Sequence, residues 1–175
     1  MTKPPTAPPG TTPHEDYLRL DRQLCFSLNA ASRAFGAVYR TLLKDLGLTY
    51  PQYLVMLALW EHTELPVKRL GELLRLDSGT LSPLLKRLEA AGLVHRERST
   101  QDERSVLVRL TPAGTELREE AALVPVRIAA ATGFNAQDAA DLRTLLERLT
   151  LALDGAALGG AVLDGAVLDS APPCD

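Results

Sequence analysis

The 175-residue sequence has few aromatic residues, two cysteines and no long apolar run. Aromatic residues make up 5% of the chain, so leucine and alanine must fill most of its core, which favours helices. A membrane span would need roughly 18 uninterrupted apolar residues, so we expect no membrane association. The first thirteen residues lack the apolar stretch of a secretory signal, and we therefore expect a cytoplasmic protein.

Cysteine and histidine are too sparse to predict a metal site or a disulfide framework. Cys25 and Cys174 lie far apart, and the three histidines, His14, His62 and His95, belong to separate segments. We expect neither a metal nor a cofactor. In a reducing compartment Cys25 is either a small packing residue or a reactive thiol, and composition leaves both readings open.

Charge is distributed unevenly along the chain. The net charge is −3, yet the stretch from Lys68 to Arg109 carries nine basic and six acidic residues and is therefore +3. The remainder is then −6. A basic segment inside an acidic protein is typical of a localised surface that binds a polyanion.

The two ends of the chain differ in composition from its middle. Residues 1–13 contain five prolines and are predicted to form a disordered arm. Residues 155–175 are rich in glycine and alanine and nearly repeat one five-residue unit, which predicts a mobile low-complexity tail. Residues 14–154 are then expected to form a single domain.

The middle of the chain is mostly helical in pattern. Apolar residues recur at spacings of three and four from Leu24 to Leu42, Gly47 follows them, and Thr49 with Pro51 is typical of a helix start. The predicted elements are helices over 15–46, 49–62, 66–74, 77–92 and 135–153, a further helix that begins at Thr111, and strands over 93–98 and 105–110.

This order of elements is that of a winged helix-turn-helix. We predict a mostly α fold with a small β-hairpin wing, in which residues from about 64 to 110 form the DNA-binding part. The N- and C-terminal helices are extra to that module, and their apolar stripes need a partner surface. A homodimer is the natural arrangement, with the flanking helices at its interface.

The second helix of the motif and the hairpin hold the candidate DNA contacts. Leu81, Leu84, Leu85 and Leu88 are assigned to the core, which leaves hydroxyl and basic side chains on the other face. Taken singly, such residues are more often caps or solvated charges, but as an ordered set they predict binding to double-stranded DNA. The candidates are Ser78, Thr80, Ser82, Lys86 and Arg87 on the helix, and Arg96, Arg98 and Arg104 on the hairpin.

Several segments carry a family resemblance. Leu76-Asp-Ser-Gly-Thr-Leu-Ser-Pro-Leu-Leu-Lys-Arg-Leu-Glu89 and Asp102-Glu-Arg-Ser-Val-Leu-Val-Arg-Leu-Thr111 resemble the recognition helix and wing of the MarR family. Gln23-Leu-Cys-Phe26 and Tyr50-Pro-Gln-Tyr53 are similar to its organic hydroperoxide resistance repressor branch. The resemblance spans residues 15–153. It implies a redox-sensing repressor that binds a pseudo-palindromic operator as a dimer and is released when an organic hydroperoxide oxidises Cys25.

The same resemblance implies that Tyr39 and Tyr50 support the thiol. Cys25 and Tyr39 are 14 residues apart, which is about 21 Å along a straight helix at roughly 1.5 Å per residue. We therefore expect Tyr39 to come from the other subunit. Asn29 stands where members of the branch often have a further tyrosine, so the shape of the pocket is left open.

Other functions and fates of the thiol are also considered. The chain could be a repressor gated by a small aromatic ligand, with Cys25 merely structural. It could also be a thiol peroxidase, but no second catalytic cysteine lies near Cys25 in the sequence, and we expect no enzyme activity. Oxidised Cys25 would form a disulfide with Cys174 or with a low-molecular-weight thiol, or would be overoxidised.

Overall fold

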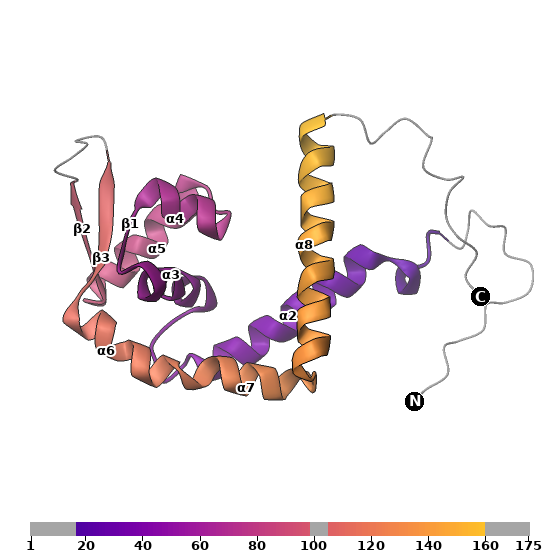
Figure 1. Cartoon of the computed structure of the whole chain (residues 1–175), viewed down its shortest axis with the longest axis horizontal. Helices are drawn as coiled ribbons and strands as arrows, with labels where there is room; N and C mark the ends of the chain where they lie inside the picture. The colour runs from indigo at the N-terminus through magenta and orange to yellow at the C-terminus, as the bar shows by residue number, and fades with distance from the viewer. Residues whose placement is uncertain (1–16, 99–104, 160–175) are drawn as a thin grey trace, which may run out of the picture. The chain divides into compact units, whose positions relative to one another are not determined.

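The structure is a computed structural model that describes residues 17–98 and 105–159 (Figure 1). It divides into one unit that ends at Ala131 and a second that begins at Thr132. The predicted arm over 1–13, the tip of the hairpin with Arg104, and residues 160–175 with Cys174 lie outside the described residues. Within the described ranges, no helix is long and apolar enough to cross a membrane.

The first unit holds the predicted winged helix-turn-helix, and the fold class is confirmed. Its elements are η1 (Leu20–Arg22), α2 (Leu24–Leu42), α3 (Tyr50–His62), β1 (Glu64–Pro66), α4 (Val67–Leu74), α5 (Ser78–Ala90), β2 (Val94–Arg98), β3 (Val106–Leu110), α6 (Pro112–Ala121) and most of α7 (Leu123–Thr132). The second unit contains α8 (Ala136–Gly159).

The first long helix begins nine residues later than predicted. Gln23 explains the difference, because its side-chain amide donates to the backbone carbonyls of Tyr17 and Arg19. The Arg19 guanidinium also pairs with the Asp21 carboxylate at 2.7 Å. These local bonds hold a separate short turn, η1, in place of a continuous helix. Cys25 is therefore the second residue of α2 and not a mid-helix residue.

The ends of the other helices also depart from prediction in places. α2 ends at Leu42 and not at residue 46, and Gly47, with φ +65°, closes the turn that follows. The helix predicted from Thr111 is two helices, α6 and α7, separated at Ala122. α8 extends to Gly159, six residues past its predicted end, because alanine and leucine around Gly155 favour the helix.

The wing, formed by β2 and β3, belongs to a three-stranded antiparallel sheet in the order β1-β3-β2. The hairpin of β2 and β3 matches the prediction, whereas β1 was not predicted because three residues show no alternation. Arg109 on the central strand pairs with Glu64 at 2.7 Å and with Glu97 at 2.9 Å. One guanidinium therefore links all three strands.

Helix α3 lies at the centre of the core. It buries Tyr53, Val55, Met56, Leu59 and Trp60, and Figure 1 shows α4 and α5 above it and α6 below it. The four leucines of α5 that the sequence assigns to the core, Leu81, Leu84, Leu85 and Leu88, are all buried. The opposite face of α5 is therefore free to meet a ligand.

The base of the wing is closely packed against α6. Thr111 caps α6 by accepting a hydrogen bond from the Gly114 N–H at 3.0 Å, and its hydroxyl donates to the Gly92 carbonyl at 2.6 Å. A Cβ atom added to Gly114 would lie 2.0 Å from the Leu93 carbonyl oxygen. Glycine is required here by the close approach of two backbones.

We predict that Gly114→Ala lowers the free energy of unfolding by about 1–3 kcal/mol, because the methyl group must displace the wing base. Gly155→Ala is the matched control, since a Cβ there meets nothing within 4 Å. It should raise the free energy of unfolding by about 0.5–1 kcal/mol. Urea unfolding followed by circular dichroism measures both, and a Gly114→Ala protein as stable as wild type would contradict the packing described.

Candidate functional site

The start of α5 is fixed by Asp77. Its carboxylate accepts hydrogen bonds from the backbone N–H and the hydroxyl of Thr80, both at 2.9 Å. These two bonds lower the pKa of Asp77. Ser78 and Thr80 are exposed beside this cap, so their hydroxyls stand at the N-terminal end of the predicted recognition helix.

The predicted DNA contacts lie on the surface of the first unit. Lys86 and Arg87 on α5 and Arg98 on β2 are exposed, and Ser82 is partly buried. A groove between α4, α5 and the wing is lined by residues that include Lys68, Ser78, Ser82, Arg96 and Val106. The structure thus brings two of the predicted hydroxyls and Arg96 to one surface, while Arg104 lies outside the described residues.

Arg96 is occupied by an ion pair. Its Nε and Nη2 atoms lie 2.9 and 2.5 Å from Glu89 Oε2, and its backbone N–H donates to Oε1 at 3.1 Å. The side-chain hydrogen bond from Arg96 lowers the pKa of Glu89. This contact fastens β2 to the last turn of α5, so the arrangement suits Arg96 for holding the wing in place.

Cys25 occupies the first turn of α2 and is exposed. The backbone N–H groups of a first helical turn have no partner within the helix and attract negative charge. None of the nineteen residues of α2 is buried in the described chain. Leu24 and Phe26, on either side of the thiol, are 61% and 44% exposed, which is a large apolar surface for a monomer.

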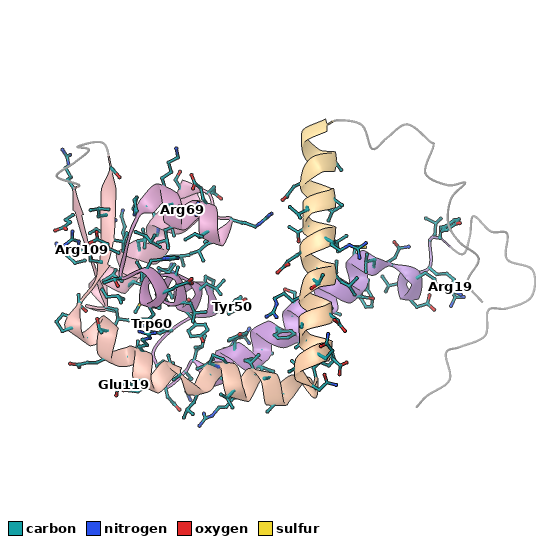
Figure 2. All side chains as sticks on the ribbon, viewed as in Figure 1. Arg19, Tyr50, Trp60, Arg69, Arg109 and Glu119 are labelled. Carbon is teal, nitrogen blue, oxygen red and sulfur yellow. The ribbon has the colours of Figure 1, made fainter. Side chains whose placement is uncertain are left out.

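Tyr39 and Tyr50 lie together, at the far end of α2 from the thiol. Their ring centroids are 4.5 Å apart, and Figure 2 shows Tyr50 at the beginning of α3. Burial is the main cause of a raised pKa for Tyr39, with Tyr50 as a second cause. Because α2 is unbroken, Cys25 and Tyr39 are separated by about 21 Å within one chain. The three predicted residues therefore do not meet inside one subunit.

Three residues near these candidate sites were not singled out by the sequence analysis: Tyr53, Trp60 and Glu89. Tyr53 lies 5.9 Å from Tyr39 and 6.2 Å from Trp60 between ring centroids. Their spacing of seven on one helix was the available signal. No sequence spacing pointed to Glu89, because its contact with Arg96 forms only after the chain turns at Gly92. Within the described residues, no group of histidine, cysteine and acidic side chains could hold a metal.

The chain is similar to known transcriptional regulators in sequence and in fold. A model of the transcriptional regulator SarA/Rot family matches residues 37–121. The organic hydroperoxide resistance transcriptional regulator of Bacillus subtilis is 49% identical over 139 residues, covering 79% of this chain and 92% of the relative. The regulator TtmR of Methylorubrum extorquens is 48% identical, covering 82% and 72%. Reduced AbfR bound to DNA is 36% identical with a TM-score of 0.65, covering 80% and 98%.

The ion pair of Glu89 and Arg96 gives a pH-dependent prediction. In Arg96→Gln, the pKa of Glu89 should rise toward its ordinary value, because the hydrogen bonds to the guanidinium are lost. Since the pKa of Glu89 is lowered in the folded protein, the pair stabilises the wing at neutral pH. That contribution is lost as the pH falls through the folded-state pKa.

Carboxyl-carbon NMR titration of Glu89 measures this change. Arg69→Gln is the matched control, since Arg69 forms an exposed pair with Glu72 at 3.1 Å and does not contact Glu89. It should leave the Glu89 titration unchanged. Identical Glu89 titrations in wild type and Arg96→Gln would show that the pair is not formed in solution.

Proposed function

Because this chain belongs to the MarR family of winged-helix transcriptional regulators, in its organic hydroperoxide resistance branch, we propose that it is a homodimeric redox repressor. In the reduced state it binds a pseudo-palindromic operator in the cytoplasm, and oxidation of Cys25 by an organic hydroperoxide releases it. The observation that carries this proposal is the exposed thiol in the first turn of α2.

The chemical step is a two-electron oxidation of sulfur. The Cys25 thiolate attacks one oxygen of the hydroperoxide, an S–O bond forms and the O–O bond breaks. The other oxygen leaves as an alkoxide and takes up a proton to give the alcohol. The resulting sulfenic acid then condenses with a low-molecular-weight thiol or with Cys174, forming a disulfide and releasing water.

The sensor pocket is proposed to form between subunits. Within one chain Cys25 cannot reach Tyr39, so the tyrosine pair that supports the thiol comes from the partner. The exposed apolar residues of α2 and of α8, such as Leu145 and Leu151, support a dimer because isolated subunits would leave them in water. Asn29, also exposed on α2, then lies in the pocket at the place of the branch's further tyrosine.

The DNA contacts are proposed to divide by type. The exposed face of α5 enters the major groove and offers Ser78, Thr80, Ser82, Lys86 and Arg87 to bases and phosphates. Arg98 and Arg104 reach the minor groove from the wing, while Arg96 holds the wing against α5. Two such surfaces fit successive half-sites only if the dimer keeps them about 34–36 Å apart, which oxidation at the interface would disturb.

A second candidate is a repressor gated by a small aromatic ligand. A cleft lined by Tyr53, Leu57, Trp60 and Arg118, among others, supports it, because it offers aromatic rings and a cation. Release from DNA by a phenolic compound, equally in wild type and Cys25→Ser, would favour this candidate. We further propose that hydroperoxide is a signal and not a substrate turned over repeatedly, since the relatives are transcriptional regulators.

The redox function predicts a loss of operator affinity on oxidation that depends on Cys25. The probe is a duplex selected from a random library by the reduced protein, and the oxidant is one equivalent of cumene hydroperoxide. Wild type should lose at least tenfold in affinity, about 1.4 kcal/mol, whereas Cys25→Ser should bind equally before and after treatment.

Fluorescence anisotropy measures the affinities, and mass spectrometry reports the state of Cys25. Cys174→Ser separates the two routes of the sulfenic acid, because a Cys25–Cys174 disulfide cannot form in it. Unchanged operator affinity in wild-type protein with fully oxidised Cys25 would overturn the redox model.

A further inference from the structure

Four aromatic rings connect the tyrosine pair to the core of the winged helix. We name Tyr50, Tyr39, Tyr53 and Trp60 the aromatic chain. Successive ring centroids lie 4.5, 5.9 and 6.2 Å apart, within the range of direct ring packing. Tyr53 is 2% exposed and Trp60 8%, so the inner half of the chain is enclosed by the protein. Tyr39 therefore packs directly against the enclosed ring of Tyr53.

The inner end of the aromatic chain is hydrogen-bonded to α6. The indole Nε1 of Trp60 donates to the Gly114 carbonyl oxygen at 2.8 Å, and this bond is buried. A buried indole N–H without a partner would cost free energy, so the indole and the α6 backbone should move together. In Figure 2 the label Trp60 marks α3 and the label Glu119 marks α6, and the two helices lie side by side.

Gly114 in turn lies against the residues that join α5 to the wing. The contact between Gly114 and the Leu93 carbonyl is too close for any Cβ. Gly92, with φ +72°, lies two residues past the end of α5, and the Leu93 N–H donates to the Leu88 carbonyl at 3.0 Å. The backbone that Trp60 holds is therefore in contact with Leu93, whose N–H is hydrogen-bonded to the last turns of the recognition helix.

We propose that Trp60 is a positioning residue that couples the Tyr39–Tyr50 pair to the recognition helix and the wing. This inference rests on the proposed redox function and adds the route by which oxidation alters DNA binding. Loss of the contacts around Tyr39 shifts Tyr53, and the Trp60 indole then moves the Gly114 carbonyl and the end of α5.

Closely packed rings can transmit such a shift because a dense interior has few voids to absorb it. Coupling between the two sites is measured as a change in the ratio of two affinities. The ratio of interest is the operator affinity of the reduced dimer divided by that of the oxidised dimer. A residue with a merely structural role would change stability and leave this ratio intact.

The test compares Trp60→Phe, which keeps a ring and removes the N–H donor, with two changes at Tyr53. Tyr53→Leu breaks the aromatic chain, and Tyr53→Phe keeps it. Val55→Ala is the matched control, because Val55 is fully buried on the same helix outside the chain. Full-length dimers are measured with the selected operator duplex, after mass spectrometry confirms equal oxidation of Cys25.

We expect Trp60→Phe and Tyr53→Leu to reduce the affinity ratio at least fivefold relative to wild type. Tyr53→Phe and Val55→Ala should keep the ratio within twofold. Trp60 is the one tryptophan of the chain, so its emission reports this site directly. Oxidation should shift that emission in wild type and Tyr53→Phe and leave it unchanged in Tyr53→Leu.

If folded Trp60→Phe keeps the wild-type ratio of reduced to oxidised operator affinity, the coupling role of Trp60 is overturned and the proposed redox function is not. An unchanged Trp60 emission on oxidation of the wild type would do the same. Wild-type protein whose operator affinity does not respond to oxidation would instead overturn the proposed function. If Tyr53→Leu fails to fold, Trp60→Phe and the wild-type emission still decide the outcome.

Discussion

An α-helix is a rigid spacer, and the function proposed for this protein depends on that property of α2. Cys25 stands in the first turn of α2 and Tyr39 in its last, with no break between them. The separation of about 21 Å cannot be shortened without unfolding the helix. A thiol pocket built from these residues must therefore take its two halves from two subunits, which makes the sensor a property of the dimer interface.

A sensor at an interface can reach the DNA surface by a short path. Tyr39 packs on the side chains of α3, and α3 is the helix that the rest of the winged helix surrounds. From α3, the indole of Trp60 reaches α6, whose first turn is pressed against the junction of α5 and the wing. Glu89 and Arg96 then fix the wing on α5. The proposed reading surface and the tyrosine pair of the proposed sensor thus share one packed frame.

Much of this frame could be predicted from local sequence. The helix starts near Thr49 and Asp77 and the apolar spacing of α5 depend on nearby residues, and the structure confirms them. The start of α2 could not be found this way, because the residues before Leu24 are compatible with a helix. In the structure, the side chains of Gln23 and Arg19 form local bonds that hold these residues in a separate turn.

Contacts between distant segments were also beyond local reasoning. The β1 strand exists only by pairing with β3, and the Glu89–Arg96 pair forms only once the wing folds back on α5. At the thiol, the resemblance to a family pointed to Cys25, Tyr39 and Tyr50, and helical geometry then separated them. The structure then showed that the rings of Tyr39 and Tyr50 pack against each other and that Cys25 lies in the first turn of its helix.

A mixed dimer tests the shared pocket most directly. One subunit carries Cys25→Ser, and the other carries Tyr39→Phe with Tyr50→Phe but keeps its thiol. The remaining Cys25 then meets intact tyrosines only if they come from the partner, so the account predicts oxidation by cumene hydroperoxide at the wild-type rate. Oxidation as slow as in the Tyr39→Phe, Tyr50→Phe homodimer would place thiol and tyrosines in the same subunit and contradict it.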